Sequence, residues 1–275
     1  MTLITRLSTA FTDTTLPLLR KDPVLPTTSL TGAGDRVLYD WKNVGTWPSQ
    51  ATAINAGQQF FSLADPTVAG VGDGVAANIS ATYNPTTGRV STVNFPGLIL
   101  EDAATDIFSD PAADYVVSFW MSVDAVRAFP ALITKGSGDL NTNTHSFIVY
   151  GGNSNTSVTW YQPAATDADA RSNFISFPSS SITLGQMNRF GIHWTKSSGS
   201  WRIRGVLNNG TPQAYKSMTH GTDANGIQIL SSRLAVRAEA EMDFARIYVE
   251  NLTVSGRTAE QVWDADWARA NGRYS

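Results

Sequence analysis

The sequence contains no cysteine, which excludes a disulfide framework and a thiolate metal site. It has no run of lysine or arginine, and its formal net charge is −3. A nucleic-acid-binding surface needs a basic stripe that displaces counterions from phosphates, so we expect no nucleic-acid partner. Apolar stretches of the length needed to span a bilayer are also lacking, and we expect no membrane insertion.

Histidine is scarce as well, with three copies at His145, His193 and His220. Their scatter does not provide the short ligand spacing of a zinc site. A Ser-His-Asp catalytic triad built on one of these histidines has no support in the sequence, because no Gly-x-Ser-x-Gly turn precedes a helix. His193 lies in an alternating segment and is expected to be a packing residue.

Apolar residues are plentiful, at 42% of the chain, whereas charged residues make up 16%. This balance is typical of a folded chain with a large core. Every second residue is apolar over residues 115–123, 190–194 and 201–207, with Arg202 and Arg204 on the opposite parity. Many short alternating segments between turn clusters predict an all-β protein, an antiparallel sandwich or barrel.

The C-terminal region carries the pattern of a short helix. Thr258 and Gln261 form a capping box, and Gly272 marks the end of the helix. Trp263 and Trp267 are four residues apart and therefore share one helical face, so we expect both to pack against the β-structure.

Residues 1–34 differ in texture from the rest, with prolines in a threonine-rich stretch. Two interpretations are equally supported: a flexible leader segment, or an extended arm that attaches to a partner subunit through apolar patches. The arm would dock through Leu3, Leu7, Leu16, Leu18 and Leu19. Residues 35–275 are then the sandwich, in which residues 35–90 form either its first strands or a collar.

Five blocks carry a family resemblance, in order: residues 115–120, 131–136, 182–194, 201–210 and 242–248 followed by 258–262. The ordered set, which covers about residues 90–265, resembles the laminin-G-like (concanavalin A-like) lectin and glucanase superfamily. That resemblance implies a jelly-roll sandwich. The turn 208–210 reads Asn-Asn-Gly where the family usually has an acidic turn, which weakens any transfer of calcium or ligand residues.

The combination of arm and sandwich is also similar to structural proteins of tailed bacteriophages. This resemblance implies a non-enzymatic virion protein of the tail, baseplate, fibre or head decoration, located in the virion. Its partners would be other virion proteins and copies of itself, and the sandwich would either bind a host-surface glycan or only decorate and stiffen the particle. A free carbohydrate-binding module is the alternative, since fold alone does not choose among such roles.

Two sets of side chains are candidates for ligand binding. Trp160 and Tyr161 precede a polar loop and could stack on a sugar, although both could instead cover the edge of the sandwich. We expect no bound ion; calcium is the alternative, with Asp139, Asp167 and Asp169 in carboxylate-rich loops as candidate ligands, and the missing acidic turn counts against it. No other cofactor is expected.

Glu239 and Glu241 are the most enzyme-like residues, because two carboxylates on one face of a strand could serve a glycosidase. Glycan cleavage by this pair is the less favoured alternative. Asp243 shares its parity with Ile247 and Val249, so we expect it to face the interior and to hydrogen-bond backbone groups.

Overall fold

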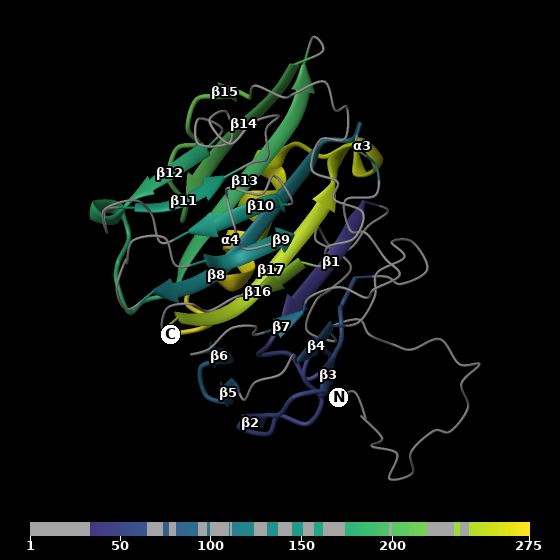
Figure 1. Cartoon of the computed structure of the whole chain (residues 1–275), viewed down its shortest axis with the longest axis vertical. Helices are drawn as coiled ribbons and strands as arrows, with labels where there is room; N and C mark the ends of the chain where they lie inside the picture. Colours follow the sequence, from purple (N-terminus) through teal and green to yellow (C-terminus); the bar gives the residue numbers. More distant parts are fainter. Residues whose placement is uncertain are drawn as a thin grey trace, which may run out of the picture.

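The computed structural model describes residues 34–64, 74–76, 81–92, 98–99, 110, 112–123, 131–136, 145–150, 157–161, 174–197, 200–218, 234–236 and 242–275. Within these residues the strands form two antiparallel sheets, which Figure 1 shows as stacked layers. This arrangement confirms the predicted antiparallel β-sandwich.

The first sheet contains the long central strands. Its order is β15 (Lys216–Ser217), β14 (Ser200–Leu207), β13 (Asn188–Ser197), β8 (Tyr115–Val123), β17 (Met242–Asn251), β6 (Arg89–Thr92), β5 (Ala81–Asn84) and β2 (Ala53–Ile54), and β1 (Asp35–Asp40) also pairs with β17. Two strands from the N-terminal part of the chain, β1 and β6, therefore pair with β17, its last long strand.

The second sheet is built from shorter strands. Its order is β12 (Phe174–Pro178), β11 (Ser157–Tyr161), β10 (His145–Tyr150), β9 (Ala131–Gly136), β16 (Leu234–Val236), β7 (Leu98–Ile99), β4 (Gly74–Ala76) and β3 (Gln59–Phe60), and the 3-10 turn η2 (Ser179–Ser181) follows β12.

Aromatic side chains fill part of the space between the sheets. Phe190 of β13 stacks on Phe119 of β8 at 5.4 Å between ring centroids, and its edge meets Phe177 of β12 at 5.3 Å. Gly205 of β14 leaves room for Phe177, because a Cβ there would lie 2.7 Å from the phenylalanine Cζ. Each fully buried side chain of this kind stabilises the fold by about 1.5 to 3 kcal/mol.

The outer face of the first sheet is covered by helix α4 (Ala259–Ala270), which follows the shorter α3 (Leu252–Ser255). The predicted capping box between Thr258 and Gln261 is confirmed. Trp263 is buried, and Trp267 stacks on Trp120 of β8 at 5.4 Å, as the shared helical face predicts. Among the residues described, none of the helices is long and apolar enough to cross a membrane.

A buried polar network joins α4 to the sheet. The Asp266 carboxylate accepts hydrogen bonds from Ser118 Oγ at 2.5 Å, Trp120 Nε1 at 2.8 Å and Arg246 Nε at 2.7 Å. Arg246 also pairs with Asp40 of β1 at 3.1 Å. Burial alone would raise the pKa of Asp266, but Arg246 and the two hydrogen-bond donors lower it below its usual value.

The residues after α4 return to the N-terminal strands. The backbone carbonyl of Arg273 accepts from Lys42 Nζ at 2.6 Å, and that of Tyr274 accepts from Arg89 Nε at 2.6 Å. The Tyr274 ring is buried and lies 6.0 Å from Trp120. The end of the chain is therefore tied down by specific contacts rather than left to fray.

The expected orientation of Asp243 is wrong. Strand β17 has a bulge between Phe244 and Arg246, and the alternation shifts there by one residue. Asp243 pairs with Ser122 in register, which places it on the outer face, and its carboxylate accepts from Ser91 Oγ at 2.5 Å. Its partners are thus side chains, not backbone groups.

We predict that replacing Asp266 by alanine lowers the free energy of unfolding by about 3 to 5 kcal/mol, because it leaves the Arg246 charge buried without its main partner. Chemical denaturation measures this change. Asp264→Ala, at an exposed position of the same helix, is the matched control and should change stability by less than about 0.5 kcal/mol. Equal losses in the two variants would contradict a structural role for the network.

Candidate functional site

A groove of about 420 Å³ opens on the outer face of the first sheet, beside the N-terminal end of α4. Strands β13 and β14 provide His193, Thr195 and Arg204, and the segment before β15 provides Tyr215. The connection from α3 to α4 and the first turn of α4 line the groove from the other side, with Glu260 among them. The groove is therefore built by segments far apart in sequence.

Strand alternation explains why polar side chains meet in this groove. Ile192 and Trp194 are buried in the core, so His193 and Thr195 point to the opposite face of β13. His193 pairs in register with Arg204 of β14, and residues paired in this way share a face of the sheet.

Tyr215 is the exposed aromatic side chain of the groove, with 38% of its surface accessible. The Arg204 guanidinium lies 4.4 Å from the centroid of its ring, and the Arg202 guanidinium lies 5.7 Å away. The Tyr215 hydroxyl lies 2.9 Å from His193 Nδ1. These contacts hold the ring in one orientation while leaving part of it open to solvent.

The two arginines that line the groove form ion pairs within the protein. Arg204 forms a 2.5 Å salt bridge with Glu260, whose side chain is 46% exposed. Arg257 donates from Nε to Glu250 at 2.8 Å and from Nη2 to the Tyr248 hydroxyl at 3.0 Å. Burial would raise the pKa of Glu260, but a backbone hydrogen bond and the Arg204 charge lower it below its usual value.

Hydroxyl groups and a carboxylate line the end of the groove nearest β8. Thr195 Oγ1 donates to the Asp114 carboxylate at 2.8 Å, and the Asp114 backbone N–H donates to Thr253 Oγ1 at 2.9 Å. Each of these oxygens has lone pairs for a further hydrogen bond. The groove thus offers one aromatic face surrounded by hydrogen-bonding groups.

His193 forms part of the floor and is 6% exposed. Its ring meets Tyr215 and Trp263 edge to face, at 5.7 Å and 6.4 Å between centroids, in line with the packing role expected from the sequence. Burial, with the nearby Arg204 charge as a second cause, lowers the pKa of His193 to about 4. The imidazole is therefore neutral at neutral pH.

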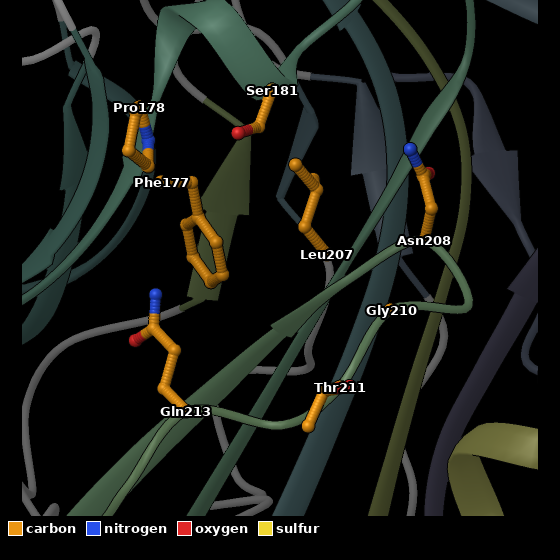
Figure 2. Close-up of a pocket in the computed structure, with 8 residues that line it drawn as sticks. All are labelled: Phe177, Pro178, Ser181, Leu207, Asn208, Gly210, Thr211 and Gln213. Carbon is orange, nitrogen blue, oxygen red and sulfur yellow. The ribbon is translucent and has the colours of Figure 1, made fainter.

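A second hollow of about 370 Å³ lies between β12 and the segment that connects β14 to β15 (Figure 2). Its wall contains Phe177 and Leu207, and the amides of Asn208 and Gln213 stand at its edge. These amides are already used, since Gln213 Nε2 donates to the Ser176 carbonyl at 2.9 Å and Asn208 Oδ1 accepts from a backbone N–H at 2.9 Å. The hollow consequently has fewer groups left for a ligand than the groove.

Strand β11 contains the two aromatic residues that the sequence favoured for sugar binding. Trp160 pairs in register with Ile175 and Tyr161 with Phe174, but their side chains are outside the described part of the structure. The other candidate residues lie wholly outside the described residues: Asp139, Asp167, Asp169, Glu239, Glu241, Leu3, Leu7, Leu16, Leu18 and Leu19. Their predicted roles remain predictions. Over the ranges that are described, no group of three or more His, Asp or Glu side chains could hold a metal ion.

The groove is not predictable from the sequence. Alternation correctly predicts that Arg204 points away from the core, but nothing in the sequence places α4 beside it. Tyr215 is a lone aromatic residue in a polar segment, which is a weak signal on its own.

No family model matches the sequence, and no curated protein matches it either. Solved structures give distant likenesses. The receptor-binding domain of botulinum neurotoxin mosaic serotype C/D aligns at 9% identity and a TM-score of 0.46, covering 87% of this chain and 52% of that chain. The binding domain of botulinum neurotoxin serotype D aligns at 9% identity and a TM-score of 0.44, covering 87% of this chain and 52% of that chain.

A protein of unknown function from Shewanella oneidensis MR-1 aligns at 10% identity and a TM-score of 0.37, covering 82% of this chain and 90% of that chain. The present chain spans about half the length of the two neurotoxin domains. At this level of similarity the comparisons assign neither a family nor a ligand to the chain.

We predict that His193 makes stability depend on pH. Its pKa is about 4 in the folded protein against 6.5 ordinarily, so the unfolded chain binds more protons between these values. The free energy of unfolding should fall by up to about 3 kcal/mol as the pH drops through this window. Denaturation of the wild type and of His193→Asn at several pH values isolates the effect, and identical pH dependence in both would contradict it.

Proposed function

We propose that this chain is a non-catalytic binding module that takes up a neutral glycan in the groove beside Tyr215. The observation that carries the proposal is the partly exposed Tyr215 ring, fixed by Arg204 and His193 at the side of a groove. An aromatic face offers its negative quadrupole to the C–H face of a pyranose. Surrounding polar groups can then bind the sugar hydroxyls, as in other concave ligand sites with few polar anchors.

The pairing of charges supports a neutral ligand. Arg204 is matched by Glu260, and Arg257 by Glu250. A charged ligand would have to displace one of these partners, whereas sugar hydroxyls can share the remaining lone pairs and N–H groups. The groove therefore suits a neutral polyhydroxy compound better than an ionic one.

A binding role also fits the carboxylates that are described. Asp243 is engaged by Ser91 and by Arg89, which lies 3.4 Å away. Asp114 and Glu260 in the groove are engaged by Thr195 and Arg204. Carboxylates held in this way stabilise the fold, and we propose no glycan cleavage by them.

We further propose that the module belongs to a virion structural protein of a tailed bacteriophage. What supports this setting is the sequence: its ordered resemblance blocks and the distinct texture of residues 1–34. Residues 1–34 would attach the protein to other virion proteins, and the sandwich would contact a host-surface glycan. Mass spectrometry of gradient-purified particles tests this setting, and absence of the protein from the particles would rule it out.

For the groove, we predict that Tyr215→Ala lowers glycan affinity about tenfold or more, because it removes the stacking surface without touching the core. Binding to an array of neutral oligosaccharides, followed by calorimetry, provides the measurement. Thr211→Ala, in the hollow of Figure 2, is the control and should leave affinity unchanged. Full affinity in the Tyr215 variant would place the site elsewhere, with β11 the next region to test.

A further inference from the structure

We propose that His193 is a positioning residue of the groove: it holds Tyr215 in its binding orientation and so sets glycan affinity through that side chain. This inference rests on the proposed function of the groove. Strand alternation alone assigns His193 to packing, and a packing residue would not change glycan affinity through the Tyr215 hydroxyl.

His193 contributes only a small part of its surface to the floor of the groove. With 6% of its surface exposed, the imidazole lies behind Tyr215 and against Trp263. Its Nδ1 lies 2.9 Å from the Tyr215 hydroxyl, while Nε2 has no hydrogen-bond partner among the described residues. The imidazole therefore acts on the groove chiefly through one hydrogen bond to the exposed ring.

The backbone beside Tyr215 is anchored, since the Gln213 N–H donates to the Gly205 carbonyl at 2.8 Å, so the bond to His193 acts on the orientation of the Tyr215 side chain. The residue precedes β15, which has two residues, Lys216 and Ser217, and pairs with β14 through Ile203 and Arg202. The Arg204 guanidinium supports the ring by stacking, but stacking allows the ring to slide or tilt. The hydroxyl contact with His193 fixes the far end of the side chain.

Charged groups from three segments face His193, and its imidazole is neutral at neutral pH. Arg204 faces it from β14, Glu260 from α4 and Asp114 from the segment before β8. Burial and the Arg204 charge keep the imidazole neutral by lowering its pKa to about 4. In the neutral tautomer that carries its proton on Nε2, Nδ1 accepts the hydrogen bond from the Tyr215 hydroxyl, and the phenolic oxygen keeps its lone pairs for a sugar hydroxyl.

Two substitutions separate this role from packing. In asparagine the amide oxygen is bonded to Cγ, as Nδ1 is in histidine, so His193→Asn can still accept from Tyr215. In glutamine the amide group is one bond farther out, where Nε2 lies in histidine, so His193→Gln loses the acceptor at the Nδ1 position. Both variants keep a neutral polar side chain in the same buried place.

The experiment is calorimetric titration with a panel of neutral methyl pyranosides, the glycosides of glucose, galactose, mannose and N-acetylglucosamine. We expect His193→Asn to bind within about threefold of the wild type and His193→Gln to bind about five- to tenfold more weakly, the range of one hydrogen bond. In a Tyr215→Phe background the two variants should bind equally, because the bond they differ in is absent.

Equal affinities of the two variants in the wild-type background, or a difference that persists in the Tyr215→Phe background, would overturn the positioning role. If the wild-type protein binds none of the probes, the proposed function fails and this inference fails with it. Near-ultraviolet circular dichroism checks that the variants fold. Should His193→Gln not fold, His193→Leu takes its place in the same comparison: it lacks the acceptor too, and it should weaken binding about five- to tenfold in the wild-type background but not in the Tyr215→Phe background.

Discussion

The ion pair between Arg246 and Asp266 lies where β17, β8 and α4 meet, and the rest of the outer face depends on it. Both side chains are almost fully buried, so each charge needs the other and its hydrogen-bond partners to compensate for lost hydration. Asp40 extends the pair to β1, and Ser118 and Trp120 extend it across β8. One carboxylate thereby fixes the helix on the sheet.

This constraint is what gives the groove its shape. The first turn of α4 carries Glu260, which meets Arg204 of β14, and the preceding Arg257 is held by Glu250 of β17. A helix that shifted along the sheet would carry Glu260 away from Arg204 and remove the ion pair of the guanidinium that stacks on Tyr215. Helix α4 thus takes part in both the buried network and the groove, and we expect it to link the stability of the fold to the proposed glycan binding.

The sequence predicted the local features well and the long-range ones poorly. Alternation correctly placed Phe119 and Phe190 in the core, and the capping box of α4 formed as expected. The orientation of Asp243 was wrong because a bulge near Ala245 shifts the alternation, and no local pattern reveals a bulge. The place of Tyr215 in a groove could not be predicted, because the residues around it belong to strands and a helix that meet only in the folded protein.

The most direct test of the central claim is an NMR titration of protein labelled at its tyrosine rings, with neutral methyl pyranosides as probes. The signal of Tyr215, assigned by its loss in Tyr215→Phe, should shift saturably while signals of buried tyrosines such as Tyr39 and Tyr83 stay fixed. Saturable shifts at Tyr161 with none at Tyr215 would contradict the account and move glycan binding to β11.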